Sequence, residues 1–300
     1  MPSIFWTGRL TIPMQIMVNA NNMLALLVGK ATNTAVMKSR VRGGYEGRFS
    51  HHVEEYDQLG LSLQERAAGV QLQGLQLAGQ SVVDIGCGTG VLALKALQAG
   101  ARNAVCGDIA MLMMEPAKHK ALPNPGTFRF SQLDAEDLPF ADSSFDVALS
   151  GMTFGLLPNQ HKALQEMIRV VKPGGLISIG AHGPEHYWEA IDGCFRAVNK
   201  RYVLGYRLEF WPRTEAYLRQ LASRARLEDI HSYREAWKTR FTSGGAMYDF
   251  FAAITAAWWY SNFPPEEVSR DSERTRAYFD RNGRDTITDD VIAVWGRKAG

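Results

Sequence analysis

Short apolar runs alternate with helical stretches along the chain from about residue 60. A short apolar run bounded by turn residues is typical of a buried strand, whereas apolar positions at helical spacing are typical of an amphipathic helix. The alternation predicts repeated β–α units around a mostly parallel sheet. The predicted strands are 81–85, 103–107, 127–130, 145–150 and 176–180, and the predicted helices between them are 91–99, 111–120 and 161–171.

The pattern changes after residue 181, where longer helical stretches and most of the tryptophans are found. We expect helices at 185–201, 214–225, 247–260 and 265–281, with strands at 228–233 and 290–295. These segments are interpreted as the end of the same sheet with helical insertions that form a cap. The expected organisation is therefore an N-terminal helical extension or lid (1–59), a core (60–182), and a cap with the last two strands (183–300).

The composition is that of an ordinary soluble globular protein, with 300 residues of which 46% are hydrophobic and 21% charged. A net charge of +2 argues against a globally basic nucleic-acid binder. Cys87, Cys106 and Cys194 form no Cys-x-x-Cys pair, which argues against a disulfide framework and against a cysteine zinc site. We therefore expect a reducing compartment and no metal site.

The small net charge conceals an unequal distribution of charge along the chain, because residues 1–45 contain five basic residues and no acidic one. Asparagines interrupt this segment, so its apolar run at 23–28 is too short for a membrane span and fits a secretory signal poorly. We favour an extension that packs on the body or on a partner, including a second copy of the chain, in a cytoplasmic protein. The alternative is an organelle transit peptide, since such peptides are basic and poor in acidic residues.

The strongest local signal is a glycine-rich turn between a predicted strand and a predicted helix, VVDIGCGTG at 82–90. Such a turn lets the backbone approach a nucleotide-like ligand closely. The spacing is G-x-G-x-G, and the third glycine of a dinucleotide fingerprint would fall on Val91. Asp84, directly before the turn, would repel a pyrophosphate but suits an ammonium group. The turn therefore favours a zwitterionic cofactor without phosphate.

Acidic residues also follow the next two predicted strands. Asp108 ends the second strand, where a carboxylate can accept both hydroxyl groups of an unphosphorylated ribose. Asp134 follows the third strand and can accept a hydrogen bond from an adenine amino group. A nucleoside ligand is therefore predicted at the carboxyl ends of these strands.

Five motifs occur in the order VVDIGCGTG, VCGDIA, QLDAEDLPF, SFDVALSGM and RVVKPGGLISIG over about residues 80–180. In this order and spacing the chain resembles the class I S-adenosylmethionine-dependent methyltransferases, especially the ubiquinone/menaquinone-pathway branch (methyltransferase type 11). The resemblance implies an α/β fold with a Rossmann-like, seven-stranded, mostly parallel sheet, helices on both faces and S-adenosyl-L-methionine as cofactor. It is looser toward the C-terminus, where EFWPRTEAYLRQL and DDVIAVWGRK are similar to late elements of the family.

The resemblance assigns the methionine moiety of the cofactor to the first motif. The acid and glycines that hold it in the family correspond to Asp84, Gly86, Gly88 and Gly90. Ser150, which ends the fourth strand, is expected near the same end of the cofactor. The alternative for the three glycines is a turn with no ligand.

The nucleoside moiety is assigned by resemblance to the second and third motifs. Asp108 holds the ribose, Ile109 packs on the adenine, and the adenine is read by Asp134 and the backbone of Ala135. Asp108 is alternatively the N-cap of helix 111–120, and Asp134 alternatively caps a turn.

Methyl transfer from a sulfonium requires mainly that the acceptor is held in line with the methyl group. A base is needed only where the acceptor loses a proton. Base candidates are His182, His186, Tyr45 and His51, of which His182 directly follows the fifth strand; each is alternatively an ordinary hydrogen-bonded residue. Aromatic residues of the cap either line an acceptor pocket or pack in the cap core, and they are Tyr187, Trp188, Phe210, Trp211, Phe250, Phe251, Trp258 and Trp259.

The sequence after the fourth strand, GMTFGLLPN, lacks the Asn/Asp-Pro-Pro-Tyr motif of nucleic-acid amino methyltransferases. There is no Pro-Cys pair for attack on cytosine and no long basic run. A small, largely apolar or aromatic acceptor is favoured, with no nucleic-acid partner and no integral membrane segment. Methylation on oxygen, nitrogen or carbon is left open, including a quinone-like or isoprenoid carbon acceptor. The alternatives are a non-catalytic protein that binds the cofactor and a nicotinamide-dependent oxidoreductase.

Overall fold

The computed structural model describes residues 53–121, 127–197, 213–256 and 264–300. Most of the predicted lid, with Tyr45 and His51, lies outside these ranges, as do the cap aromatics at 210, 211, 258 and 259. The predicted boundary between residues 59 and 60 falls inside one continuous helix, α3 (Val53–Leu72). The last part of the extension and the start of the core are therefore a single element.

A single seven-stranded sheet has the order β3-β2-β1-β4-β5-β7-β6. All neighbouring strands are parallel except β7, which is antiparallel to both β5 and β6. This arrangement confirms the predicted α/β fold with a mostly parallel sheet. The strands are β1 (Ser81–Ile85), β2 (Asn103–Asp108), β3 (Phe128–Gln132), β4 (Phe145–Ser150), β5 (Val171–His182), β6 (Glu228–Arg240) and β7 (Thr286–Arg297).

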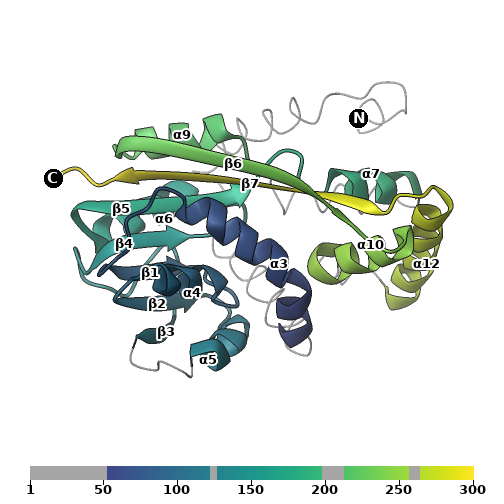
Figure 1. Cartoon of the computed structure of the whole chain (residues 1–300), viewed down its shortest axis with the longest axis horizontal. Coiled ribbons are helices and arrows are strands. Elements are labelled where there is room, and N and C mark those ends of the chain that lie inside the picture. The colour runs from purple at the N-terminus through teal and green to yellow at the C-terminus, as the bar shows by residue number, and fades with distance from the viewer. Residues whose placement is uncertain (1–52, 122–126, 198–212, 257–263) are drawn as a thin grey trace.

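Helices cover both faces of the sheet (Figure 1). α3 and α4 (Val91–Gln98) pack together on one face, with the short η3 (Met111–Met114) and α5 (Glu115–Ala121) beside them. The other face carries α6 (Gln160–Val170) and α9 (Glu215–Arg224). Chain order places the β–α turns of β1, β2 and β4 at one edge, the carboxyl ends of the parallel strands.

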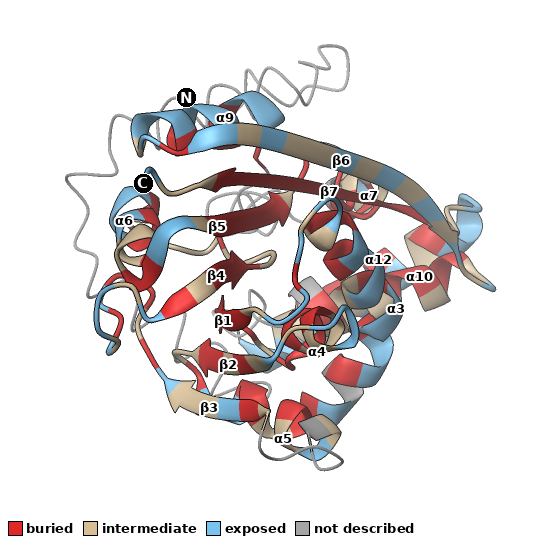
Figure 2. Ribbon diagram, turned by 60° about the vertical axis from the view of Figure 1, so that its left-hand side comes forward, coloured by how far each residue is buried: buried red, intermediate tan, exposed pale blue. Residues whose placement is uncertain are grey.

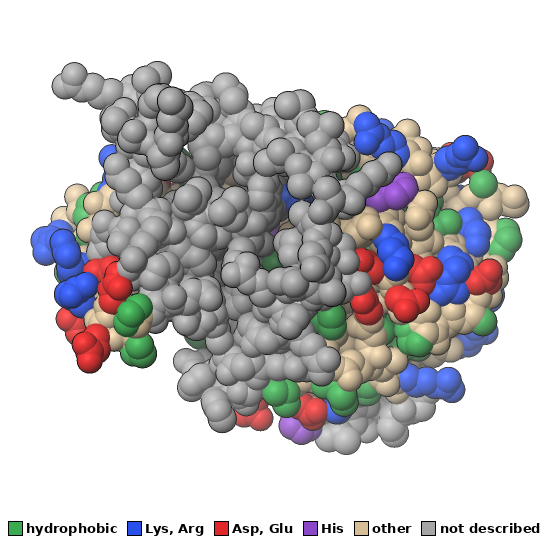
Figure 3. Space-filling view, turned by 180° about the vertical axis from the view of Figure 1, so that it is seen from behind, with side chains coloured by type: hydrophobic (Ala, Val, Ile, Leu, Met, Phe, Trp, Pro, Cys, Tyr) green, Lys and Arg blue, Asp and Glu red, His purple; other side chains and the backbone are tan. Residues whose placement is uncertain are grey.

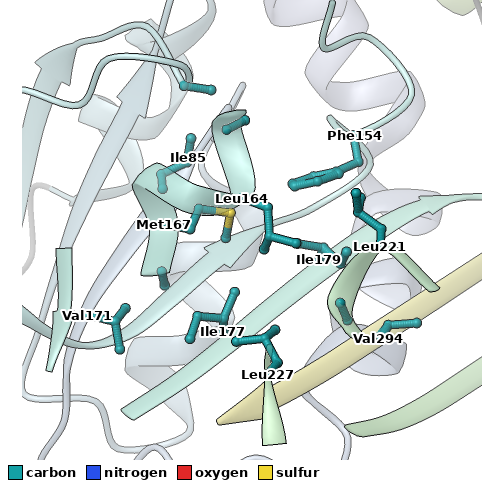
Figure 4. Packing of buried hydrophobic residues seen from close by; sticks show 14 of the residues in the cluster. Ile85, Phe154, Leu164, Met167, Val171, Ile177, Ile179, Leu221, Leu227 and Val294 are labelled. Carbon is teal, nitrogen blue, oxygen red and sulfur yellow. The ribbon is translucent and has the colours of Figure 1, made fainter. Parts of the chain in front are cut away.

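The core between the sheet and α6 and α9 is built from the apolar runs that predicted the strands. Ile177 and Ile179 of β5 interleave with Leu164 and Met167 of α6 (Figure 4). In Figure 2, β4, β5 and β7 are largely buried, whereas β6 alternates between exposed and intermediate positions. The inner strands are covered on both faces, as parallel strands in α/β proteins usually are.

The last two strands are longer than predicted. β6 continues to Arg240 and β7 begins at Thr286, because the two strands pair from Glu228 opposite Arg297 to Arg240 opposite Thr286. The sequence of β6 contains many charged residues and no continuous apolar run, so its second half carries no strand signal. This two-stranded extension projects beyond the core toward the cap (Figure 1).

The described part of the cap is a small helical cluster at the end of that extension (Figure 1). It comprises α7 (Trp188–Ala197), α10 (Gly244–Phe251), a π-helical turn η4 (Ala252–Ala256) and α12 (Pro265–Arg281). Tyr187, Tyr248 and Phe279 are buried at its centre. The aromatic residues in this described part therefore serve mainly as cap core.

Among the described residues, no helix combines the length and apolar character that a membrane span needs. On the face shown in Figure 3, basic and acidic side chains are interspersed over the described surface.

Only glycine fits at position 90, because of the backbone conformation there and because of a close neighbouring side chain. Gly90 adopts a left-handed backbone (φ 77°), and a Cβ there would stand 2.5 Å from Cβ of Ala117. We predict that Gly90→Ala lowers the free energy of unfolding by about 3 kcal/mol, measured by urea denaturation. Gly174→Ala is the matched control, because Gly174 has a similar φ of 73° but no neighbouring atom, and its cost should be about 1 kcal/mol. Equal losses in the two variants would contradict the packing role of Gly90.

Candidate functional site

A cavity of about 210 Å³ lies at the carboxyl ends of the parallel strands. Loops after β1, β2, β3 and β4 form one side, and α3 forms another. The residue that ends β5, His182, completes the wall together with Tyr187 and Ile254 of the cap. The cavity therefore extends from the predicted nucleoside side to the candidate base His182 and the cap aromatic Tyr187.

The glycine-rich turn after β1 wraps closely over the end of β2. The amides of Gly86 and Cys87 both donate to the carbonyl of Gly107, at 2.7 and 3.1 Å. Gly86 (φ 71°) has no room for a Cβ because Thr153 packs against it, and the Thr153 hydroxyl donates to the Gly86 carbonyl at 2.9 Å. Gly88 (φ 51°) has open space where a Cβ would stand and lines the cavity. A ligand can approach the backbone most closely at Gly88.

Asp108 is fixed by backbone amides and lines the cavity. Its two carboxylate oxygens accept from Gly88 N and Ala110 N, each at 2.9 Å. Burial raises the pKa of this carboxyl, and the backbone hydrogen bonds partly oppose that shift. Each oxygen retains acceptor capacity, so the carboxylate can receive two further donors from a ligand. Asp108 thus cross-links the first and second motifs and still presents acceptors to the cavity.

Asp84 lies behind the glycine-rich turn. The side chain is fully buried, and one carboxylate oxygen accepts from Ala93 N at 3.2 Å in the first turn of α4. The other, Oδ1, has no hydrogen-bond partner among the described residues. Burial and the neighbouring charge of Asp108 raise the pKa of Asp84 to about 7, whereas the Ala93 hydrogen bond opposes the shift. Asp84 does not line the cavity, so its influence on a ligand acts through the turn.

Two other predicted cofactor residues also lie behind the cavity wall. The Ser150 hydroxyl donates to the carbonyl of Ile85 at 2.8 Å, which ties β4 to β1 just before the turn. Gly90 begins α4 and packs on Ala117. Contact of Ser150 or Gly90 with a cofactor stays a prediction, and the structure gives both a role in shaping the turn.

The predicted adenine side is assembled from the second and third motifs. Ile109, Asp134 and Ala135 all line the cavity, together with Met113 and Leu133. Asp134 Oδ1 accepts from the amide of Glu136 at 2.9 Å, which holds the third motif in a tight turn. The capping alternative for Asp134 is therefore realised, and it coexists with a position on the cavity wall.

His182 and His186 lie side by side, but only His182 lines the cavity. His182 lines the cavity, and burial lowers its pKa to about 4, with Asp290 opposing and Arg213 adding to the shift. His186 stacks between His182 and Tyr187, with ring centroids 4.0 and 3.8 Å away, and does not line the cavity. Its Nδ1 accepts from Asp290 N at 3.2 Å, and burial lowers its pKa well below the usual value. Of the two, only His182 is placed to meet a ligand.

The acceptor side combines residues close to the predicted motifs with residues of α3 that no motif marks. Met152 and Tyr187 line the cavity with left-handed backbones (φ 59° and 55°), which non-glycine residues seldom adopt. Such strain is concentrated at functional sites in proteins. Gln64 and Gln71 of α3 also line the cavity. Tyr187 was an acceptor-pocket candidate from the sequence, and Met152 ends the motif SFDVALSGM. No motif marks Gln64 or Gln71, because their importance depends on contacts between distant segments.

Comparison with known proteins agrees with this geometry. Residues 83–179 match the sequence model of a methyltransferase domain family. The match begins in β1 and ends in β5, so it contains the glycine-rich turn, Asp108 and the third motif. This part of the chain is a class I S-adenosylmethionine-dependent methyltransferase domain.

Curated relatives share this methyltransferase domain. The chain is 42% identical over 103 residues to a demethylmenaquinone methyltransferase of Desulfitobacterium hafniense, covering 33% of this chain and 41% of that protein. It is 32% identical over 140 residues to a malonyl-[acyl-carrier protein] O-methyltransferase of Pectobacterium atrosepticum, covering 44% of this chain and 53% of that one. The chain thus spans only about half of these relatives or less.

A solved structure shows the same fold. The YcgJ protein of Bacillus subtilis superposes with a TM-score of 0.54 at 19% identity, over 78% of this chain and 99% of that protein. At this identity the likeness concerns the fold alone. The structural likeness and the domain match together identify the fold of the methyltransferase domain and its cofactor, S-adenosylmethionine.

Proposed function

We propose that this chain transfers the methyl group of S-adenosylmethionine to a small, uncharged, largely apolar acceptor. The observation that carries the proposal is the single cavity that joins the nucleoside side, at Asp108, to an acceptor side at Met152, His182 and Tyr187. A cofactor held by the first side directs its reactive end toward the second.

The residues present fit the cofactor. Asp108 would hold the ribose hydroxyls, and Gly88 leaves open space for close approach to the backbone. Ile109, Met113 and Leu133 offer an apolar surface for the adenine. The buried carboxyl of Asp84 provides negative charge behind the turn, toward a cationic ligand. When bound, S-adenosylmethionine would supply the methyl group as an electrophile.

The charge of the cavity wall supports an uncharged acceptor. Asp108, Asp134 and Glu136 are the carboxylates on the described wall, and none of the described wall residues is a lysine or arginine. An anionic acceptor would therefore meet repulsion from these carboxylates, and no cationic side chain of the described wall would offset it. Leu156, Leu157 and Ile254 add apolar surface. The similarity to a demethylmenaquinone methyltransferase supports a quinone-like acceptor more than a malonyl one.

His182 is the described residue best placed to serve as a base. With a pKa of about 4, its imidazole is uncharged at neutral pH and retains a lone pair. It is consequently a weak base, suited to accept a hydrogen bond from the acceptor or a proton from an acidic hydroxyl.

The proposal is tested in two steps with the full-length chain. Calorimetry should show binding of S-adenosylhomocysteine and none of NAD. Incubation with tritium-methyl-labelled S-adenosylmethionine and a cell extract should then move label into an organic-soluble small molecule. Binding without any transfer would favour a non-catalytic cofactor-binding protein, and binding of NAD alone would favour an oxidoreductase.

A further inference from the structure

Gln71 is a buried polar residue that reaches the cavity from α3. It lies one residue before the end of that helix and is only 2% exposed, yet it lines the cavity. A glutamine buried to this degree normally satisfies both ends of its carboxamide with hydrogen bonds. In Gln71 the nitrogen and the oxygen of the carboxamide differ in how many hydrogen bonds they make.

The amide nitrogen of Gln71 is bound twice. Nε2 donates to the carbonyl of Ser150 at the end of β4, at 3.1 Å, and to the carbonyl of Ser178 within the neighbouring strand β5, at 3.2 Å. Because both partners are carbonyl oxygens, which only accept, the nitrogen must face them. The orientation of the carboxamide is therefore fixed by its partners, and its oxygen faces the other way.

The chain makes room for that oxygen. A Cβ at Gly151 would stand 3.0 Å from Oε1 of Gln71, and a Cβ at Gly180 would collide with it. Both glycines have ordinary backbones without a left-handed φ, so conformation does not require glycine at either position. The space that they leave is occupied by the carboxamide.

The oxygen itself accepts no hydrogen bond from any described residue. Oε1 is not fully enclosed, and Gln71 lines the cavity. A buried acceptor oriented in this way is satisfied when a ligand brings a donor. Its position next to Gly151, which immediately follows β4, places it on the acceptor side of the cavity.

We propose that Oε1 of Gln71 accepts a hydrogen bond from a hydroxyl or N–H group of the methyl acceptor. This inference rests on the proposed methyltransferase function and narrows its substrate class to uncharged acceptors with such a donor, for example phenols or hydroquinones. Gln71 is a binding and specificity residue. A carboxamide does not take up a proton, so any deprotonation of the acceptor falls to another group such as His182.

The test compares two aromatic probes of similar size, 2-naphthol and 2-methoxynaphthalene, of which only the first has a hydroxyl donor. Their dissociation constants are measured by calorimetry with the full chain saturated with S-adenosylhomocysteine. We expect the wild-type protein to bind 2-naphthol about tenfold more tightly. This measurement needs no variant, and equal affinities would overturn the proposal.

Gln71→Met, which keeps the length of the side chain but removes the carboxamide, should abolish the preference and leave the affinity for S-adenosylhomocysteine unchanged. Gln73→Met, at an exposed position two residues further on, is the matched control and should retain it. A persistent preference in Gln71→Met with intact homocysteine binding would also overturn the inference. Failure of wild-type protein to bind S-adenosylhomocysteine would instead refute the proposed function itself.

Discussion

Asp108→Ala should weaken the binding of S-adenosylhomocysteine at least about a hundredfold in calorimetry. The variant removes the carboxylate that would accept both ribose hydroxyls, and a hydrogen bond to a charged group contributes about 1.5–3 kcal/mol. Two such bonds correspond to about 3–6 kcal/mol, which is a hundredfold or more in affinity. The variant also leaves the amides of Gly88 and Ala110 without their acceptor, which loosens the turn.

The control for this prediction is Asp137→Ala, which removes an exposed carboxylate near the same end of the sheet. Its affinity for S-adenosylhomocysteine should match that of the wild type. Thermal melts establish that both variants are folded. Unchanged affinity in a folded Asp108→Ala protein would refute the assignment of the ribose to this residue and leave helix capping as its role.

Asp84 should make both stability and cofactor affinity depend on pH near neutrality. Its pKa is about 7 in the folded, ligand-free protein and close to 3.8 when the chain is unfolded. The folded state therefore binds this proton more tightly, so the resulting stabilisation is complete below about pH 4. It is lost as the pH rises through about 7. S-adenosylmethionine carries positive charge and should bind more tightly as Asp84 ionises.

The measurement is a series of thermal melts from pH 5 to 8, with and without S-adenosylmethionine. The melting temperature of the wild-type protein should fall as the pH rises. The increase in melting temperature that added S-adenosylmethionine produces should grow as the pH rises. Asp84→Asn should flatten both trends. Asp289→Asn is the matched control, because burial also raises the pKa of Asp289, to about 6, but this residue lies in β7 and not behind the glycine-rich turn. Asp289→Asn should change the dependence of stability on pH but not the pH dependence of the cofactor's effect.

A cofactor affinity that stays constant from pH 5 to 8 in the wild type would contradict an electrostatic role for Asp84 toward the ligand. An equal effect of Asp289→Asn on affinity would show that the pH dependence belongs to the fold as a whole.

The nucleoside half of the site was predictable because its signals are local. Asp108 and Asp134 directly follow buried strands, and the carboxyl ends of adjacent parallel strands meet at one edge. The motifs after β1, β2, β3 and β4 therefore meet at one edge, although these strands lie in the order β3-β2-β1-β4 and not in their chain order. Asp84 and Ser150 show the limit of this reasoning, since both lie at or next to a strand end and are buried, but neither lines the cavity.

The acceptor half could not be predicted in the same way. His182 and His186 are four residues apart and equivalent as sequence signals, yet only His182 lines the cavity. Gln71 lies in a helix with no motif, and its partners, Ser150 and Ser178, are 79 and 107 residues away. The sequence predicted β6 only to residue 233, whereas the strand continues to Arg240. Its second half is held by pairing with β7 and has no strand signal in its own composition.

By itself, the sequence determined the class of the fold, the position of the glycine-rich turn and the acids at the strand ends that we assign to a nucleoside. These features depend on hydrophobic periodicity and on residues within a few positions of a strand end. Only the tertiary structure decided which side chains line the acceptor side, which acids lie behind the turn, and that α3 presents Gln71 to the cavity. Those outcomes depend on burial and on contacts between segments far apart in the chain, and a linear pattern of apolar and polar residues does not encode such contacts locally.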